Sequence, residues 1–176
     1  MHRLITLMQK DEERMEILSI VRSLELVDCY VAAGFVRNLV WDWLHGIRTP
    51  VNDVDIVFFD NTDSRNLSAT KHQAALMAAY PAINWDVKNQ AHMHHRNNDI
   101  QYKNTLDAMS YWPEKETAVG ARLDNENNIL IVSAFGLDGL FRGTLTYNSK
   151  RSKQIFHSRV CSKNWLNIWP KLQVVL

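Results

Sequence analysis

The most constraining feature of the chain is the segment 53–59, DVDIVFF, in which acidic and apolar residues alternate before an apolar run. Side chains along a β-strand point to the two faces of a sheet in turn. We therefore expect a strand that presents Asp53 and Asp55 on one face and buries Val54 and Ile56 on the other. Two carboxylates at this spacing repel each other unless a cation or a proton lies between them. Mg2+ (or Mn2+) suits such a pair, because it needs few protein ligands and keeps positions for phosphate oxygens.

A second feature lies upstream, where a short apolar segment, residues 29–33, ends at Gly34. This pattern predicts a strand that turns at Gly34, whose backbone can approach a ligand closely, into a helix over residues 36–45. The free N–H groups at the start of a helix bind anions. Arg37, in the first turn, carries a guanidinium that can bind phosphate oxygens through two hydrogen bonds. A solvated strand edge would also explain the two aspartates, but Gly34 and Arg37 favour the metal interpretation.

The pattern of residues 83–88 predicts another strand of the same sheet. Ile83, Trp85 and Val87 fall on one face, and polar residues fall on the other. Asp86 is therefore a carboxylate on a strand whose opposite face belongs to the core. An aspartate on a solvated strand face is the competing interpretation.

These residues resemble a known superfamily. The pattern Gly34-x-x-Arg37-Asn38, then Gly46, then Asp53-x-Asp55 is similar to the head of polymerase-beta nucleotidyltransferases. The form in tRNA CCA-adding enzymes and poly(A) polymerases is the most similar; there a Gly-Gly-x-x-Arg-Asp run precedes the DxD strand. This sequence departs from that pattern at two places, because Ala33 replaces the first glycine and Asn38 replaces the aspartate.

Three later segments, together with the first, resemble a bacterial family of small, stand-alone nucleotidyltransferase-like proteins whose substrate is not established. The resemblance extends from Leu18 to Leu172 and is carried by Trp85–His94, by Pro113-Glu114-x-x-Thr117-Ala118-x-Gly120-x-Arg122 and by Phe135-Gly136-Leu137-x-Gly139-Leu140-Phe141. It implies an α+β fold, a nucleotidyltransferase-type mixed β-sheet flanked by helices, with N- and C-terminal helices packed around it. We expect residues 1–176 to form a single domain of this kind.

The resemblance also implies roles for individual residues. Asp86 takes the place of a third carboxylate, which joins Asp53 and Asp55 as a metal ligand and catalytic residue. Nucleotide binding is implied for Gly34, Arg37 and Asn38 and for the run Lys88, Asn89 and Gln90. The histidines that follow, His92, His94 and His95, have no assigned role; a zinc site is a weaker alternative, because no cysteine lies close in sequence.

Composition restricts the partners. The chain has 176 residues and a formal net charge of +1, which gives no overall basic field for binding nucleic acid. One local basic group is present in the last third of the chain, Lys150, Arg151, Lys153, Arg159 and Lys163, although a solvated helix face explains it equally well. Cys29 and Cys161 are expected to be free thiols in a reducing cytoplasm. No apolar run is long enough to span a membrane.

The remaining elements follow from periodicity and turn residues. We expect a polar loop over residues 61–68, a β-hairpin with strands at 121–124 and 129–134, and Gly46 as a helix C-cap. Helices are expected over residues 1–25, 67–80, 105–111, 136–147 and 156–169.

The leading functional hypothesis is a Mg2+-dependent enzyme that transfers a nucleoside monophosphate from a nucleoside triphosphate to a hydroxyl acceptor. That acceptor is a small molecule, a protein side chain or an RNA end; small size and low charge weigh against long RNA. The alternative is a catalytically inactive nucleotide-binding or regulatory module, for instance a toxin–antitoxin component, which the replacements at Ala33 and Asn38 suggest. The preferred nucleotide and the oligomeric state do not follow from the sequence.

Overall fold

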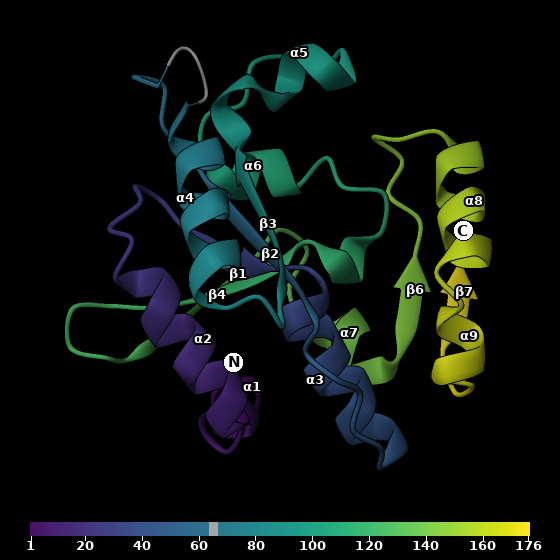
Figure 1. Ribbon diagram of the computed structural model, residues 1–176. Coiled ribbons are helices and arrows are strands. Elements are labelled where there is room, and N and C mark those ends of the chain that lie inside the picture. The colour runs from purple at the N-terminus through teal and green to yellow at the C-terminus, as the bar shows by residue number, and fades with distance from the viewer. Residues whose placement is uncertain (64–66) are drawn as a thin grey trace.

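The computed structural model describes residues 1–63 and 67–176. Within these residues a five-stranded mixed sheet has the strand order β3-β2-β1-β4-β5 (Figure 1). Strands β2 and β3 run parallel, and the other neighbouring pairs are antiparallel. The strands are β1 Tyr30–Ala32, β2 Asp53–Phe58, β3 Asn84–Asn89, β4 Val119–Leu123 and β5 Ile129–Ser133. Helices flank this sheet, so the expected α+β fold is confirmed.

The main hydrophobic core lies between one face of the sheet and the longer helices. Val54 and Ile56 of β2 and Trp85 of β3 are fully buried there. Helices α2, α3 and α4 contact β4, β2 and β3, and α1 packs against α2 and α3. These helices are α1 His2–Gln9, α2 Glu12–Arg22, α3 Gly34–His45 and α4 Leu67–Ala79. The apolar alternation of β2 and β3 therefore fixes which face of the sheet the helices cover.

The opposite face is covered only in part. Tyr30 and Ala32 of β1 and Val57 of β2 pack there against Met109 and Ala118. Met109 is the last residue of the short helix α6, Thr105–Met109. Between β3 and α6 the chain forms a 3-10 turn, η1, Gln90–His92, and the short helix α5, Met93–Asn97. A second 3-10 turn, η2, Lys115–Thr117, precedes β4. This smaller cluster buries the Val57 end of β2.

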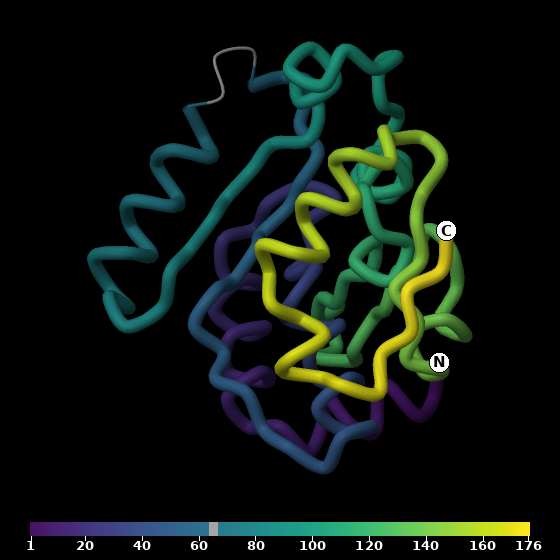
Figure 2. The backbone as a smooth tube through the Cα atoms, turned by 90° about the vertical axis from the view of Figure 1, so that its right-hand side faces the viewer, coloured from purple at the N-terminus to yellow at the C-terminus, as the bar shows by residue number. Residues whose placement is uncertain are grey.

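The C-terminal third returns to pack against α3. In Figure 2 this segment, α8 and α9 followed by β7, lies nearest the viewer over the earlier part of the chain. Its aromatic residues explain the docking, because Trp41 of α3 meets Trp169 and Trp165 edge-on, with ring centroids 5.2 and 6.0 Å apart. The elements are α7 Asp138–Arg142, β6 Thr144–Thr146, α8 Lys153–Ser162, α9 Trp165–Ile168 and β7 Gln173–Val175, with β6 and β7 paired in parallel.

Three predicted helices differ from the observed elements. The helix expected over 1–25 is two helices, because Asp11 caps α2 by accepting a hydrogen bond from the Arg14 amide (3.1 Å). The segment 136–147 contains only the five-residue α7 before strand β6. The helix expected over 156–169 is divided into α8 and α9 at Asn164, whose φ of +56° lies outside the helical range.

Several local predictions are confirmed. Gly46 caps α3 in the left-handed conformation, with φ +64°. Strands β4 and β5 form the expected hairpin. Both cysteines are free thiols, Cys29 buried and Cys161 exposed. Positions 64–66 of the predicted loop lie outside the described residues. Among the helices described, none combines the length and apolar character needed to cross a membrane.

Candidate active site

The three aspartates of interest meet on one face of the β2–β3 pair. In the parallel register, Asp55 lies opposite Asp86, and Asp53 lies opposite Asn84. Residues paired in this way point to the same face, and neighbouring strands are about 4.8 Å apart. The period-2 pattern of both strands thus predicts correctly that the Asp86 side chain emerges beside the other two. Neighbouring strands bring carboxylates 31 residues apart in sequence, Asp55 and Asp86, to adjacent positions.

The polar environment of these carboxylates is uneven. Asp53 is exposed and accepts a hydrogen bond from the side-chain Nδ2 of Asn84 (2.8 Å). Asp86 forms an ion pair with Lys88, two residues further along the same strand. Burial, and next the Asp86 carboxylate, raise the pKa of Asp55 above its ordinary value, although Lys88 acts in the opposite direction. Asp55 is therefore the member of the group at which negative charge is least well compensated.

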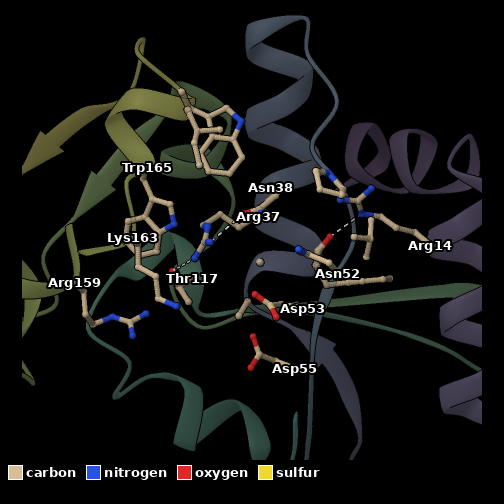
Figure 3. A pocket seen from close by; sticks show the side chains of 17 residues that line it. Arg14, Arg37, Asn38, Asn52, Asp53, Asp55, Thr117, Arg159, Lys163 and Trp165 are labelled. Atoms are coloured by element: carbon tan, nitrogen blue, oxygen red, sulfur yellow. Dashed lines mark hydrogen bonds between the residues drawn. The ribbon is translucent and has the colours of Figure 1, made fainter. Parts of the chain in front are cut away.

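A cavity of about 250 Å³ opens beside Asp53 and Asp55; we call it the site cavity. Its walls come from the start of α3, the segment before β2, and the C-terminal helices. Figure 3 shows Arg159 and Lys163 on one side and the two carboxylates on the other, with Arg37 between the carboxylates and Trp165. The lining residues are Arg14, Ala33, Gly34, Phe35, Arg37, Asn38, Pro50, Val51, Asn52, Asp53, Asp55, Thr117, Arg159, Lys163, Trp165, Ile168 and Trp169.

Arg37 is a buried cation in the wall of the site cavity. One terminal nitrogen donates to the Thr117 hydroxyl (2.8 Å) and the other to the Asn38 side-chain oxygen (3.0 Å). The guanidinium lies over the rings of Trp41 and Trp165, 4.8 and 4.5 Å from their centroids. Within the described residues no carboxylate forms an ion pair with Arg37, and its Nε has no hydrogen-bond partner. Burial lowers its pKa to about 10, so it remains charged at neutral pH and is available to an anion.

The unusual backbone of the turn lies at Ala33 rather than at Gly34. Ala33 has φ +54° and ψ −121°, a conformation that glycine adopts readily and alanine does not. Gly34, by contrast, has no positive φ, and a Cβ there would meet Asn38 at 3.5 Å, an ordinary contact. The positive φ of the turn therefore lies one residue before Gly34, which itself lines the site cavity as a close approach of its backbone to a ligand would require. The strained residue lines the site cavity, where backbone strain is often found in enzymes.

The three residues predicted to bind nucleotide at the end of β3, Lys88, Asn89 and Gln90, do not share one environment. Lys88 is on the carboxylate face, whereas Asn89 follows the alternation to the opposite face and is buried. The Asn89 side chain accepts from the amides of Asp60 and Ala91 (3.0 and 3.1 Å) and donates to the Asp60 carbonyl (2.8 Å). The side-chain amide of Asn89 therefore holds the loop that follows β2. Asn89 lines neither the site cavity nor the cavity around Lys88 and Gln90.

Two further cations of the site cavity, Arg159 and Lys163, come from the C-terminal third of the chain. Arg159 and Lys163 lie in the basic group that a solvated helix face explained, yet both line the site cavity. Arg159 is held by the fully buried Glu114, with Nε 2.5 Å from Oε1 and Nη2 3.2 Å from Oε2. Glu114 belongs to one of the segments that carried the family resemblance, and a buried glutamate needs a cationic partner. Because the burial of Glu114 is set by the fold, the sequence carried no local signal that singled out Arg159.

The donor set fits a divalent cation that is completed by substrate. Among the described residues no cluster of three or more histidine, cysteine, aspartate or glutamate side chains is placed to hold a metal by itself. The described histidines therefore give the zinc alternative no support. Asp53 and Asp55 supply carboxylate oxygens at the mouth of a cavity rich in phosphate-binding groups. Mg2+ is typically held in this way, by one or two carboxylates together with substrate phosphates.

Comparisons with known proteins identify the family and the fold of the chain. A family model described as "Nucleotidyltransferase" matches residues 19–174. A protein whose NMR structure reveals a CCA-adding enzyme head domain superposes with a TM-score of 0.87 at 28% sequence identity, over 99% of this chain and 95% of that one. A chain of a tRNA-processing enzyme complex matches with a TM-score of 0.46 and 14% identity, over 88% of this chain and 40% of that one. The comparison with curated proteins gives no match.

Proposed function

The chain belongs to the nucleotidyltransferase family, and from this membership we propose that it transfers a nucleoside monophosphate from a nucleoside triphosphate to a hydroxyl acceptor. One observation supports the proposal most strongly: Asp55 and Asp86 are register partners on one face of β2 and β3, beside a cavity lined by Arg37, Arg159 and Lys163. Carboxylates next to several cations suit a triphosphate whose charge is shared between a metal and basic side chains.

The phosphates occupy the site cavity in this proposal. Arg37 is the fixed cation, held by Thr117 and Asn38 with N–H groups to spare. Arg159, oriented by Glu114, and the exposed Lys163 bind from the C-terminal side. Arginine at two of these positions favours phosphate, because a planar guanidinium can donate two parallel hydrogen bonds.

The carboxylates perform the remaining tasks. Asp53 and Asp55 would hold Mg2+ (or Mn2+); the three aspartates predicted as joint ligands do not form a three-carboxylate metal cluster among the described residues, so substrate phosphates would complete the coordination. The metal, when bound, would neutralise charge on the triphosphate. Asp86 accepts the proton of the acceptor hydroxyl. The hydroxyl oxygen forms a bond to the α-phosphorus, the bond from that phosphorus to the oxygen bridging the β-phosphate breaks, and pyrophosphate leaves.

Substitution of Asp86 separates binding from chemistry. Asp86→Asn should retain triphosphate binding, because Asp53, Asp55 and Arg37 remain, while transfer falls by about 10²- to 10⁴-fold as expected for a lost general base. The assay incubates protein, Mg2+ and a cell lysate with each nucleoside triphosphate labelled at the α-phosphate, and follows label transferred to any component.

Asp138→Asn is the matched control, since this exposed aspartate in α7 lines neither cavity near Asp55. Transfer by the wild type and by Asp138→Asn, but not by Asp86→Asn, supports the proposal. Triphosphate binding without transfer by the wild type would instead identify a binding or regulatory module.

A further inference from the structure

Asp55 stands between two cavities. Besides the site cavity, a second cavity of about 350 Å³ also has this residue in its wall. The two cavities have four lining residues in common, Ala33, Asp55, Thr117 and Arg159. The proposed triphosphate site uses only the site cavity and leaves the second cavity free. A reactant in the second cavity therefore approaches the same carboxylate as the triphosphate but from a different direction.

The second cavity is rich in cations. Lys88, Arg96 and Arg159 line it, and Asp55 is the one carboxylate among the residues described in its lining. Lys88 and Arg159 already have acidic partners, Asp86 and Glu114. Arg96, in α5, is exposed, and no ion pair or hydrogen bond of its side chain occurs within residues 1–63 and 67–176. This guanidinium is therefore available to an anionic group of a ligand.

The rest of the wall suits a small polar molecule with some apolar surface. Val57, Met93 and the partly exposed Trp112 give an apolar side, while Gln90 and Asn97 offer side-chain amides that can bind hydroxyl groups. A volume of about 350 Å³ is near the lower end of small-molecule sites, which range from roughly 300 to 1,000 Å³. The net charge of +1 gives no overall basic field to attract a long polyanion.

We propose that the second cavity binds the acceptor, and that the acceptor is a small hydroxyl compound carrying a phosphate group, of the size of a sugar phosphate. This inference rests on the proposed nucleotidyl transfer and names its acceptor class. The phosphate lies on Arg96 and Lys88, and the hydroxyl points to Asp55, whose register partner Asp86 is on the same face of the sheet but lines neither cavity. Transfer joins that hydroxyl oxygen to the α-phosphorus, its proton passes to Asp86, and pyrophosphate leaves through the site cavity.

The test is a calorimetric titration in two stages. Wild-type protein with Mg2+ is first titrated with α,β-methylene nucleoside triphosphates, which fill the site cavity without reacting. The complex is then titrated with matched pairs: ribose 5-phosphate and ribose, glucose 6-phosphate and glucose, glycerol 3-phosphate and glycerol. We expect at least one phosphorylated member to bind tenfold or more tightly than its partner. Arg96→Met should weaken that binding about tenfold, the typical effect of losing a charge-assisted hydrogen bond.

Arg142→Met is the matched control, because Arg142 is an exposed arginine of α7 that lines neither cavity. It should leave the preference for the phosphorylated member unchanged. The inference is overturned if no pair shows a preference, or if Arg96→Met and Arg142→Met behave alike. Failure of the first titration would instead overturn the proposed function, so the two failures are distinguishable.

Discussion

The two faces of the β2–β3 pair differ in what they contribute to the molecule. On one face Val54, Ile56 and Trp85 are at most 1% exposed and form part of the main core. On the other, Asp55 and Asp86 lie side by side, and like charges at such positions destabilise the folded state. Because alternate residues of one strand serve the two faces, stability and the proposed chemistry occupy the same segment of chain without sharing a side chain. We therefore expect substitutions on the apolar face to lower the stability of the protein, and substitutions on the polar face to affect ligand binding and transfer instead.

The largest expected effect is on the apolar face. Ile56→Ala should lower the free energy of unfolding by about 2–5 kcal/mol, since it leaves a cavity in a closely packed core. Asp86→Asn, on the opposite face, should change it by less than about 1 kcal/mol, because the Asp86–Lys88 pair is about 40% exposed and screened by solvent. Chemical denaturation of both variants measures the difference. Equal losses of stability would remove the distinction between the faces.

The next effect concerns ligand binding at the polar side. Arg37→Lys keeps a positive charge but loses the planar group that donates to Thr117 and Asn38. Affinity for a nucleoside triphosphate should fall about tenfold, and the preference for the triphosphate over the monophosphate should shrink. Titration of both nucleotides against the same preparation corrects for any partial unfolding. Equal losses for the two nucleotides would show that Arg37 does not bind the terminal phosphates.

The smallest effect tests the strain at the turn. Ala33→Gly should raise the free energy of unfolding by about 1 kcal/mol, because glycine tolerates the positive φ of this residue. The matched control is Ala75→Gly in the exposed middle of α4, where the same change should lower stability by about 1 kcal/mol. If both substitutions destabilise equally, the backbone at residue 33 is not strained.

Local sequence patterns were sufficient for the sheet and its polar face. The period-2 alternation in β2 and β3 identified which residues are buried, and the parallel pairing places Asp86 where that pattern requires. The hairpin β4–β5 and the C-cap Gly46 likewise depend on short-range turn chemistry. These features are local, so one sequence is enough to predict them.

The C-terminal wall of the site could not be predicted in the same way. Arg159 lines the same cavity as Asp55 only because α8 folds back over the earlier chain, which brings residues about a hundred positions apart in sequence to one cavity. No local pattern encodes that return. The break at Asn164 and strand β6 were also missed; in β6, the alternation Thr144-Leu145-Thr146, with β-branched residues around a buried leucine, was a usable strand signal.

The central claim is that Asp55 is a carboxylate left partly uncompensated until a cation binds. Its raised pKa means that the folded state binds a proton more readily than the unfolded chain does. The stability that this proton contributes is present at low pH. It is lost as the pH rises from 3.8, the ordinary pKa of an aspartate, through the raised pKa of Asp55 in the folded state. Asp55→Asn should therefore stabilise the metal-free protein at neutral pH and weaken this part of its pH dependence.

Thermal unfolding at pH 7 with and without Mg2+ tests the claim most directly, using wild type, Asp55→Asn and the control Asp138→Asn. A ligand that binds only the folded state raises the melting temperature. We predict that Mg2+ raises it for wild type and Asp138→Asn but not for Asp55→Asn, which melts higher than wild type without metal. An equal Mg2+-induced shift in all three proteins would contradict the assignment of Asp55 as a metal ligand.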